Sequence, residues 1–300
     1  EERLTADAVL LATGGHPREL PDAQPDGERI LNWTQVYDLD ELPEELEEQP
    51  LAQRTRILAA DGTPIATVYD MNRVNVELRH VAKVMRAAIL AIEDYRFYQH
   101  GALDLKGTLR AFITNQAAGE TKQGGSSITQ QMVKLTLIQQ AGQDKEKIRA
   151  AQEETFARKF RELRYAIAIE QEHSKDWILE RYLNIAYFGD GAYGVQAAAK
   201  RYFNKNARKL TVKESAMLAG LVKNPVGYDP ADFPDRAKAR RNVVLERMAQ
   251  LNVIPQEQAD RLKEKGLGLD RQPAANGCVN SPAPFFCDYV YRYLLLDPSL

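Results

Sequence analysis

A carboxylate at the end of an apolar helical stripe is the first group able to do chemistry. Glu93 follows this stripe and shares a predicted face with Phe97 and His100. A partly desolvated carboxyl group has a raised pKa, which suits a general base. The alternative is a helix that ends in two solvated acids, Glu93 and Asp94. The stripe has apolar residues at spacings of three and four: Val81, Val84, Met85, Ala88, Ile89 and Ile92.

Two glycines, Gly124 and Gly125, precede hydroxyl side chains and a predicted helix. Free backbone N–H groups and the positive end of the helix dipole would form an anion-binding cradle there. Ser127, Gln131 and Lys134 fall on one stripe of that helix. The Gly-Lys-Ser/Thr signature is absent, so a nucleotide-binding P-loop is disfavoured. The alternative is a capped helix after a flexible loop.

A third segment places Glu162 between Arg158 and Lys159 on one predicted helical face. The two cations could hold a pyrophosphate while the carboxylate assists nearby. The alternative is a surface ion pair worth about 0.5 kcal/mol. A fourth segment, residues 174–184, has an N-cap candidate and an apolar face, and we interpret it as scaffold.

The elements that must position these groups are mostly helices. A short strand is predicted within residues 5–13 and a hairpin within residues 54–70. Residues 16–50 resemble loop, and residues 141–154 resemble an exposed, polar segment that departs from the helical body (an excursion). From about residue 78 the pattern is helical. The later helices are predicted at residues 102–117, 127–140, 156–172, 175–187, 195–202, 211–223 and 233–251, with a short one after Pro255.

Composition limits the class of protein. The 300 residues are 44% hydrophobic and 27% charged, which excludes a disordered chain. The first 50 residues hold 14 acids and 3 bases, and the other 250 hold 28 acids and 37 bases. A basic body suits an anionic partner. No apolar run approaches the ~20 residues of a membrane-spanning helix, and no signal peptide opens the chain. The first residue is not Met, so we expect the start of the protein to be missing.

The two cysteines, Cys278 and Cys287, lie nine positions apart in a proline-rich segment. They form neither a Cys-x-x-Cys motif nor a cluster with histidine, so zinc binding is disfavoured. We favour a disulfide that closes the loop, which would indicate an oxidising compartment. The alternative is two unpaired thiols.

Taken in order, the segments resemble glycosyltransferase family 51, the peptidoglycan-polymerising domain of class A penicillin-binding proteins, in the style of actinobacterial members. The similarity covers about residues 50–265. Ser127 stands where many members have Thr, and residues 141–155 lengthen the segment between the second and third motifs. The motifs are Glu93-Asp94-x-x-Phe97-x-x-His100, Gly124-Gly125-Ser126-Ser127-Ile128-Thr129-Gln130-Gln131, Arg158-Lys159-x-x-Glu162, Lys175-x-x-Ile178-Leu179-Glu180-x-Tyr182-Leu183-Asn184 and Leu218-Ala219-Gly220-Leu221-Val222-Lys223-Asn224-Pro225.

The resemblance implies a mainly α, lysozyme-like glycosyltransferase domain at residues 79–265. A short β-hairpin stalk would occupy 47–78, and 266–300 would be a linker toward a missing transpeptidase domain. It implies lipid II and the growing glycan strand as partners at a membrane surface, cell-wall synthesis proteins as further partners, and no nucleic acid. No cofactor is required, a divalent cation (Mg or Mn) is a candidate at the pyrophosphate, and no protein metal site is expected. The family works at the outer face of the plasma membrane, and we expect this chain to lack the anchor.

By position, the resemblance makes Glu93 and Glu162 the catalytic carboxylates. Glu93 would take the proton of the acceptor's 4-hydroxyl, whose oxygen attacks the donor's anomeric carbon with inversion to give a β-1,4 link. Glu162 would support the undecaprenyl pyrophosphate leaving group or orient the residues around it. The other carried-over residues would bind substrate: Asp94, Phe97 and His100 at the pocket, Ser127 and Gln131 at the donor site, and Lys134, Arg158 and Lys159 at the pyrophosphate.

Residues 1–46 resemble a different class, a fragment of a flavin-dependent pyridine nucleotide-disulfide oxidoreductase. The likeness rests on residues 6–18 and 30–33. A Gly-x-Gly-x-x-Gly loop and a redox cysteine pair are absent from the fragment, so we expect neither FAD binding nor hydride transfer, and we expect a truncated or chimeric product. The alternatives for the whole chain are a non-catalytic relic that binds lipid II or glycan, a flavin-dependent oxidoreductase, and a lysozyme-like hydrolase.

Overall fold

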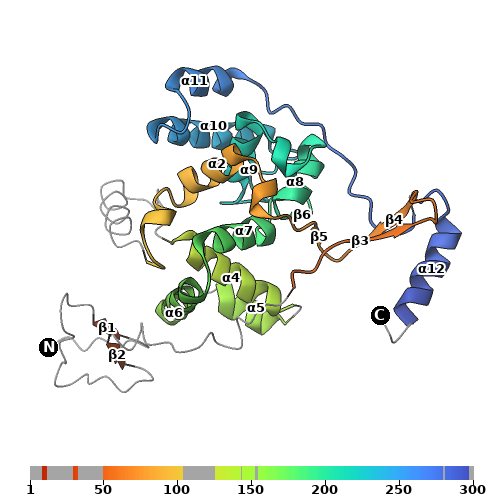
Figure 1. Ribbon diagram of the computed structural model, residues 1–300, viewed down its shortest axis with the longest axis horizontal. Helices are drawn as coiled ribbons and strands as arrows, with labels where there is room; N and C mark the ends of the chain where they lie inside the picture. The colour runs from red at the N-terminus through yellow and green to blue at the C-terminus, as the bar shows by residue number, and fades with distance from the viewer. Residues whose placement is uncertain are drawn as a thin grey trace. The chain divides into compact units, whose positions relative to one another are not determined.

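The computed structural model describes residues 9–11, 30–32, 50–103, 126–142, 144–152, 155–279 and 281–296. The chain divides into two compact units: unit 1 has residues 1–49 and 96–182, and unit 2 has residues 50–95 and 183–300. Helices predominate in both (Figure 1), so the predicted mainly α class is confirmed. Across the described ranges, no helix combines the length and the apolar composition needed to span a bilayer.

Unit 1 is built around a pair of packed helices, α4 (Ile128–Gln140) and α6 (Phe156–Glu172), which lie side by side (Figure 1). The short 3-10 turn η3 (Phe97–Gln99) comes before them in the chain. Helix α7 (Lys175–Ile185) follows α6 and runs past the boundary of the unit. The predicted helices over 127–140 and 156–172 are therefore confirmed.

Two short elements of unit 1 lie in segments for which we expected no regular structure. The predicted excursion at 141–154 contains the helix α5 (Lys145–Gln152). The segment 16–50, expected as loop, contains the strand β2 (Ile30–Asn32), which pairs in parallel with β1 (Val9–Leu11). The rest of residues 1–46, including the other positions of the oxidoreductase-like fragment, lies outside the described residues, as do the predicted helix from 104 onward and both glycines of the second motif.

Unit 2 has a core made by three helices, α2 (Lys83–Glu93), α9 (Val212–Leu221) and α10 (Pro234–Gln250), each packed against the other two. The inward side of α2 is the apolar stripe read from the sequence. Met85, Ala88 and Ile89 are fully buried, whereas Val84 and Ile92 are half-buried at the edges. Burial of these side chains stabilises the helix that carries Glu93, at about 25 cal/mol per Å² of apolar surface.

Two further helices of unit 2 contact this core, and a small sheet contacts one of them. Helices α8 (Val195–Phe203) and α11 (Gln256–Glu264) complete the predicted helical series. The strand β5 (Asn72–Arg73) pairs in parallel with β6 (Ala192–Tyr193). The buried guanidinium of Arg73 lies 5.5 Å from the ring centroid of Tyr193. The pair thereby adds a cation–π contact to the two-residue sheet.

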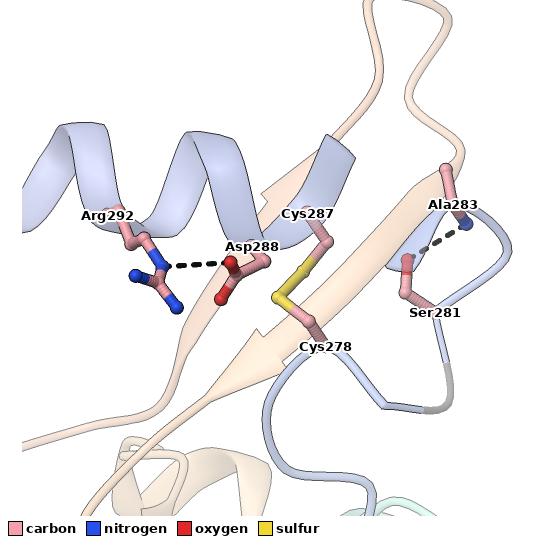
Figure 2. Close-up of a disulfide and its surroundings, with 6 residues drawn as sticks. All are labelled: Cys278, Ser281, Ala283, Cys287, Asp288 and Arg292. Carbon is pink, nitrogen blue, oxygen red and sulfur yellow. Dashed lines mark hydrogen bonds and ion pairs between the residues drawn. A yellow bond between two sulfur atoms is a disulfide. The ribbon is translucent and has the colours of Figure 1, made fainter. Parts of the chain in front are cut away.

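The predicted hairpin forms from β3 (Thr55–Leu58) and β4 (Pro64–Val68), which pair antiparallel. The helix α12 (Pro284–Leu296) packs against it, and the disulfide between Cys278 and Cys287 closes the loop before that helix (Figure 2). Cys287 is fully buried against Ile57 and Ala66. We call the hairpin, the disulfide loop and α12 the stapled module.

Candidate active site

The residues expected to do chemistry fall on both units, and each group is described within its own unit. In unit 2, Glu93 is the last residue of α2, and Asp94 is the C-cap, whose backbone N–H donates to the Leu90 carbonyl at 2.9 Å. Asp94 is only 8% exposed. The alternative of two solvated acids is therefore wrong for Asp94, because the buried stripe of α2 carries it into the protein.

In unit 1, the turn that follows is anchored by a buried ring. Phe97 is 1% exposed, and the ammonium of Lys175, the first residue of α7, lies 4.5 Å from its ring centroid. The neighbouring Tyr98 donates its hydroxyl to Asp176 at 2.7 Å. At the end of the turn, Nδ1 of His100 donates to the Gly101 carbonyl at 2.5 Å. Phe97 and His100 therefore lie in one turn that is bound to the start of α7.

Ser127 is the N-cap of α4 and joins this helix to the residues just after the turn. It forms a capping box with Gln130: its hydroxyl accepts from the Gln130 backbone at 3.3 Å, while the Gln130 side chain accepts from the Ser127 backbone at 3.2 Å. The same hydroxyl donates to the Ala102 carbonyl at 2.8 Å, and the residue is 4% exposed. The capped-helix interpretation is thus confirmed for Ser127, and its hydroxyl fixes where the helix begins.

The third motif forms a buried cluster of charges. Glu162 binds the guanidinium of Arg158, and their side chains are 3% and 5% exposed. Its other carboxylate oxygen, Oε2, lies 3.3 Å from Nζ of Lys159, which is half-exposed and donates to the hydroxyl of Ser126 at 2.9 Å. The interpretation as a surface ion pair is therefore wrong for Arg158 and Glu162. Through Lys159, the cluster reaches the loop that precedes α4.

The other two residues of the predicted donor stripe lie on α4. Oε1 of Gln131 accepts a hydrogen bond from the hydroxyl of Tyr182 at 3.0 Å, and Tyr182 is fully buried in α7. Lys134 follows one turn later and is half-buried. Their spacing places them along the helix whose N-terminus is next to Ser126 and the cluster of Arg158, Lys159 and Glu162.

Sequence reasoning missed a second carboxylate of α6. Glu170 accepts from the hydroxyl of Thr129 and, at 2.7 Å, from the ammonium of Lys175. Thr129 and Lys175 lie inside quoted motifs, but we interpreted the segment of Lys175 as scaffold. Glu170 lies outside the quoted motifs, so only its contacts with Thr129 and Lys175 in the folded chain could identify it.

Comparison with known proteins adds the family. The transglycosylase family model matches residues 61–249. Penicillin-binding protein 1F of Bacillus subtilis (strain 168) is 37% identical over 236 residues, which are 79% of this chain and 30% of that protein. Penicillin-binding protein 1A of Neisseria gonorrhoeae is 38% identical over 242 residues, which are 81% of this chain and 28% of that protein.

Among solved structures, the 2.6 Å crystal structure of penicillin-binding protein 1A from Haemophilus influenzae is 23% identical, with a TM-score of 0.44. The match covers 82% of the present chain and 25% of the chain in that crystal structure. The chain thus spans less than a third of the length of these relatives. The family model, however, matches more than half of the 300 residues, and all five motifs lie within the matched range. The chain belongs to the transglycosylase family.

Proposed function

We propose that this chain is a peptidoglycan glycosyltransferase that polymerises lipid II into β-1,4-linked glycan with inversion and releases undecaprenyl pyrophosphate. Membership of the transglycosylase family supports glycosyl transfer. The observation that carries the proposal is the cluster of Arg158, Lys159 and Glu162 beside Ser126 in unit 1. A pyrophosphate leaving group gains negative charge as its bond to the sugar breaks, and fixed cations stabilise that charge most where water is excluded.

The contacts of Glu162 favour one of the two roles that the resemblance left open. A single carboxylate binds both Arg158 and Lys159, so its charge fixes where the two cations lie. We assign Glu162 to orienting these cations rather than to direct contact with the leaving group. The half-exposed Lys159 would meet the pyrophosphate, and Lys134 on α4 would add a further positive charge.

Glu93 would act as the general base. It would take the proton of the acceptor's 4-hydroxyl while that oxygen forms a bond to the donor's anomeric carbon and the bond to the pyrophosphate oxygen breaks. The position of Glu93 as the last residue of α2, a helix held by its buried apolar stripe, supports this role. The buried Asp94 and Phe97 would shape the pocket around the acceptor, with His100 at the end of the turn.

No cofactor enters this scheme. The part of the chain that the structure describes has no group of three or more His, Cys, Asp or Glu side chains arranged to hold a metal ion. We propose that a divalent cation would be bound by the pyrophosphate itself. Because the polyprenyl tail of lipid II lies in a bilayer, the reaction would take place at a membrane surface, which in the family is the outer face of the plasma membrane.

The test is polymerisation of purified lipid II in detergent by the whole chain and by Glu93→Gln. Glu77→Gln is the matched control, because Glu77 is an exposed carboxylate of the same unit that pairs with Arg79. We expect polymer from the wild type and from Glu77→Gln, and none from a normally folded Glu93→Gln. Turnover by Glu93→Gln at the wild-type rate would remove Glu93 as the base.

Other outcomes separate the alternatives. If the wild type binds a phosphoglycolipid inhibitor but makes no polymer, the chain is a binding module and the proposal is wrong. If preformed glycan strands become shorter, the chain is a hydrolase. A flavin absorption spectrum in the purified protein would instead favour the oxidoreductase alternative.

A further inference from the structure

Glu170 joins three segments of unit 1 that carry different motifs. It lies near the end of α6, and its side chain is 11% exposed. One of its oxygens, Oε1, accepts from both the hydroxyl of Thr129 and the ammonium of Lys175. Thr129 is in the first turn of α4, and Lys175 is the first residue of α7. A single carboxylate therefore holds the N-termini of two helices.

The third segment is the turn that contains Phe97 and His100. The ammonium of Lys175, while bound to Glu170, also lies 4.5 Å from the centroid of the Phe97 ring. A Cβ atom built on Gly101 would lie 3.8 Å from Oε2 of Glu170, so the end of the turn passes next to the carboxylate. The negative charge of Glu170 thus fixes the cation that covers Phe97.

The strength of this arrangement depends on charge and on burial. Thr129 is fully buried and Phe97 is 1% exposed, so solvent screens these contacts weakly. A glutamine at position 170 would keep an acceptor for Thr129 but would lose the ion pair with Lys175. Hydrogen bonds to charged groups are stronger than those between neutral groups. The turn and the start of α4 would then be held less tightly.

We propose that Glu170 is a positioning residue for glycosyl transfer. It holds the Phe97–His100 turn against the start of α4, where Ser126 and Ser127 lie, without touching substrate. This inference rests on the proposed function, because the turn is expected to line the catalytic pocket. A displacement of about 1 Å in such a site lowers turnover about 100-fold, so a group that sets this geometry alters kcat more than KM.

The first experiment measures kcat and KM for lipid II in four variants. We expect Glu170→Gln and Thr129→Val each to lower kcat about 10- to 100-fold with KM changed less than about threefold. Thr129→Ser keeps the hydroxyl and should restore turnover. Glu172→Gln is the matched control, since Glu172 is exposed and only two residues further along α6. Wild-type kcat in both Glu170→Gln and Thr129→Val would overturn the proposal.

A double variant tests whether the two residues act together. Glu170→Gln with Thr129→Val should lower kcat by less than the product of the two single losses, because Thr129 and Lys175 bind the same oxygen of Glu170. Independent, multiplied losses would contradict a shared role. The melting temperature of every variant should also be measured. If kcat falls in proportion to the melting temperature in every variant, Thr129→Ser included, Glu170 contributes only to stability and the proposal is overturned.

Amide hydrogen exchange separates this inference from the proposed function. In Glu170→Gln we expect faster exchange in the peptides that cover residues 96–102 and 126–132, and no change in Glu172→Gln. If the wild type makes no polymer but these peptides respond as expected, the proposed function fails while the positioning contact stands. If exchange in both peptides is unchanged, the positioning role is wrong whatever the activity.

Discussion

The carboxylate of Glu162 binds the guanidinium of Arg158 one turn earlier in α6, and the two side chains are 3% and 5% exposed. Two charges at this depth stabilise each other, and removal of Arg158 leaves the buried Glu162 with the half-exposed Lys159 as its remaining ion-pair partner. The pair is therefore a structural requirement of unit 1 as well as part of the proposed pyrophosphate site. This dual role can be separated experimentally.

Arg158→Met should lower the free energy of unfolding by about 3–5 kcal/mol, because Glu162 stays buried and keeps only the half-exposed Lys159 as an ion-pair partner. Adding Glu162→Leu should recover most of this stability but no polymerisation. Urea unfolding of the wild type, the single variant and the double variant measures the stability, and lipid II polymerisation by the same three proteins measures the activity. The control is Arg292→Met, which breaks an ion pair of the same spacing that is 74% and 52% exposed and should cost less than about 1 kcal/mol. Equal small losses in both single variants would contradict the prediction.

Lys134→Ala should lower kcat/KM for lipid II about 10- to 100-fold, the equivalent of one charge-assisted hydrogen bond to phosphate. The melting temperature should change little, since the residue is half-buried on α4. Steady-state polymerisation assays with Lys147→Ala as control, an exposed lysine of α5, provide the measurement. An unchanged kcat/KM in Lys134→Ala would exclude a contact between Lys134 and the pyrophosphate.

Asp190 holds the segment after α11 to the body of unit 2. It accepts hydrogen bonds from Arg201 at 2.8 Å and from Arg271 at 2.7 Å. Burial alone would raise the pKa of Asp190, but the hydrogen bonds and charges of the two arginines outweigh it and hold the pKa below its usual 3.8. The stabilisation is therefore complete above the unfolded-state pKa and is lost as the pH falls toward the lower folded-state pKa.

Asp190→Asn should accordingly destabilise unit 2 by about 1–3 kcal/mol at pH 6 and progressively less below about pH 4. Asparagine is a suitable replacement because Asp190 has a φ of 48°, in the left-handed region that Asn also tolerates. Unfolding free energies at several pH values, compared with those of Asp232→Asn at an exposed site, test the sign. A difference between wild type and Asp190→Asn that grows toward acid would be the wrong sign.

Reduction of the disulfide between Cys278 and Cys287 should loosen the stapled module and leave the helical core of unit 2 intact. Opening a loop with a sequence separation of 9 costs about 2–3 kcal/mol in the chain-entropy account. We expect faster proteolysis at Arg292 with reductant and no change in polymerisation rate. The control is the variant with both cysteines replaced by serine, on which reductant should have no effect. A fall in polymerisation on reduction would mean that the stapled module contributes to the site.

Arg241 is fully buried, and its guanidinium donates to the carbonyls of Lys263, Lys265 and Gly266 at the end of α11, at 2.8 to 3.1 Å. Arg241→Met would leave these carbonyls without their donor and should cost about 3 kcal/mol. Arg241→Lys should recover little of this stability, because a single ammonium cannot direct several N–H donors to three carbonyls as the planar guanidinium does. Thermal unfolding of both variants checks this, and full recovery by lysine would show that charge alone is sufficient.

The sequence by itself determined the family, the main helices and hairpin, and the cysteine pair. Motif order identified the family, periodicity predicted the helix over 156–172, and the Asp61-Gly62 turn signal predicted the hairpin. The two cysteines, nine positions apart, were correctly expected to pair. All of these depend on residue identity and short-range spacing, which are fully present in one dimension.

Only the tertiary structure decided which faces are buried. Spacing placed Arg158 and Glu162 on one helical face but could not show that this face packs inward, because burial depends on α4, a different segment of the chain. The same holds for Glu170, whose partners Thr129 and Lys175 come from two other helices. No pattern in the neighbouring sequence marks a single glutamate such as Glu170. Its role depends on the hydrogen-bond and ion-pair partners that distant segments supply once the apolar surfaces have packed together.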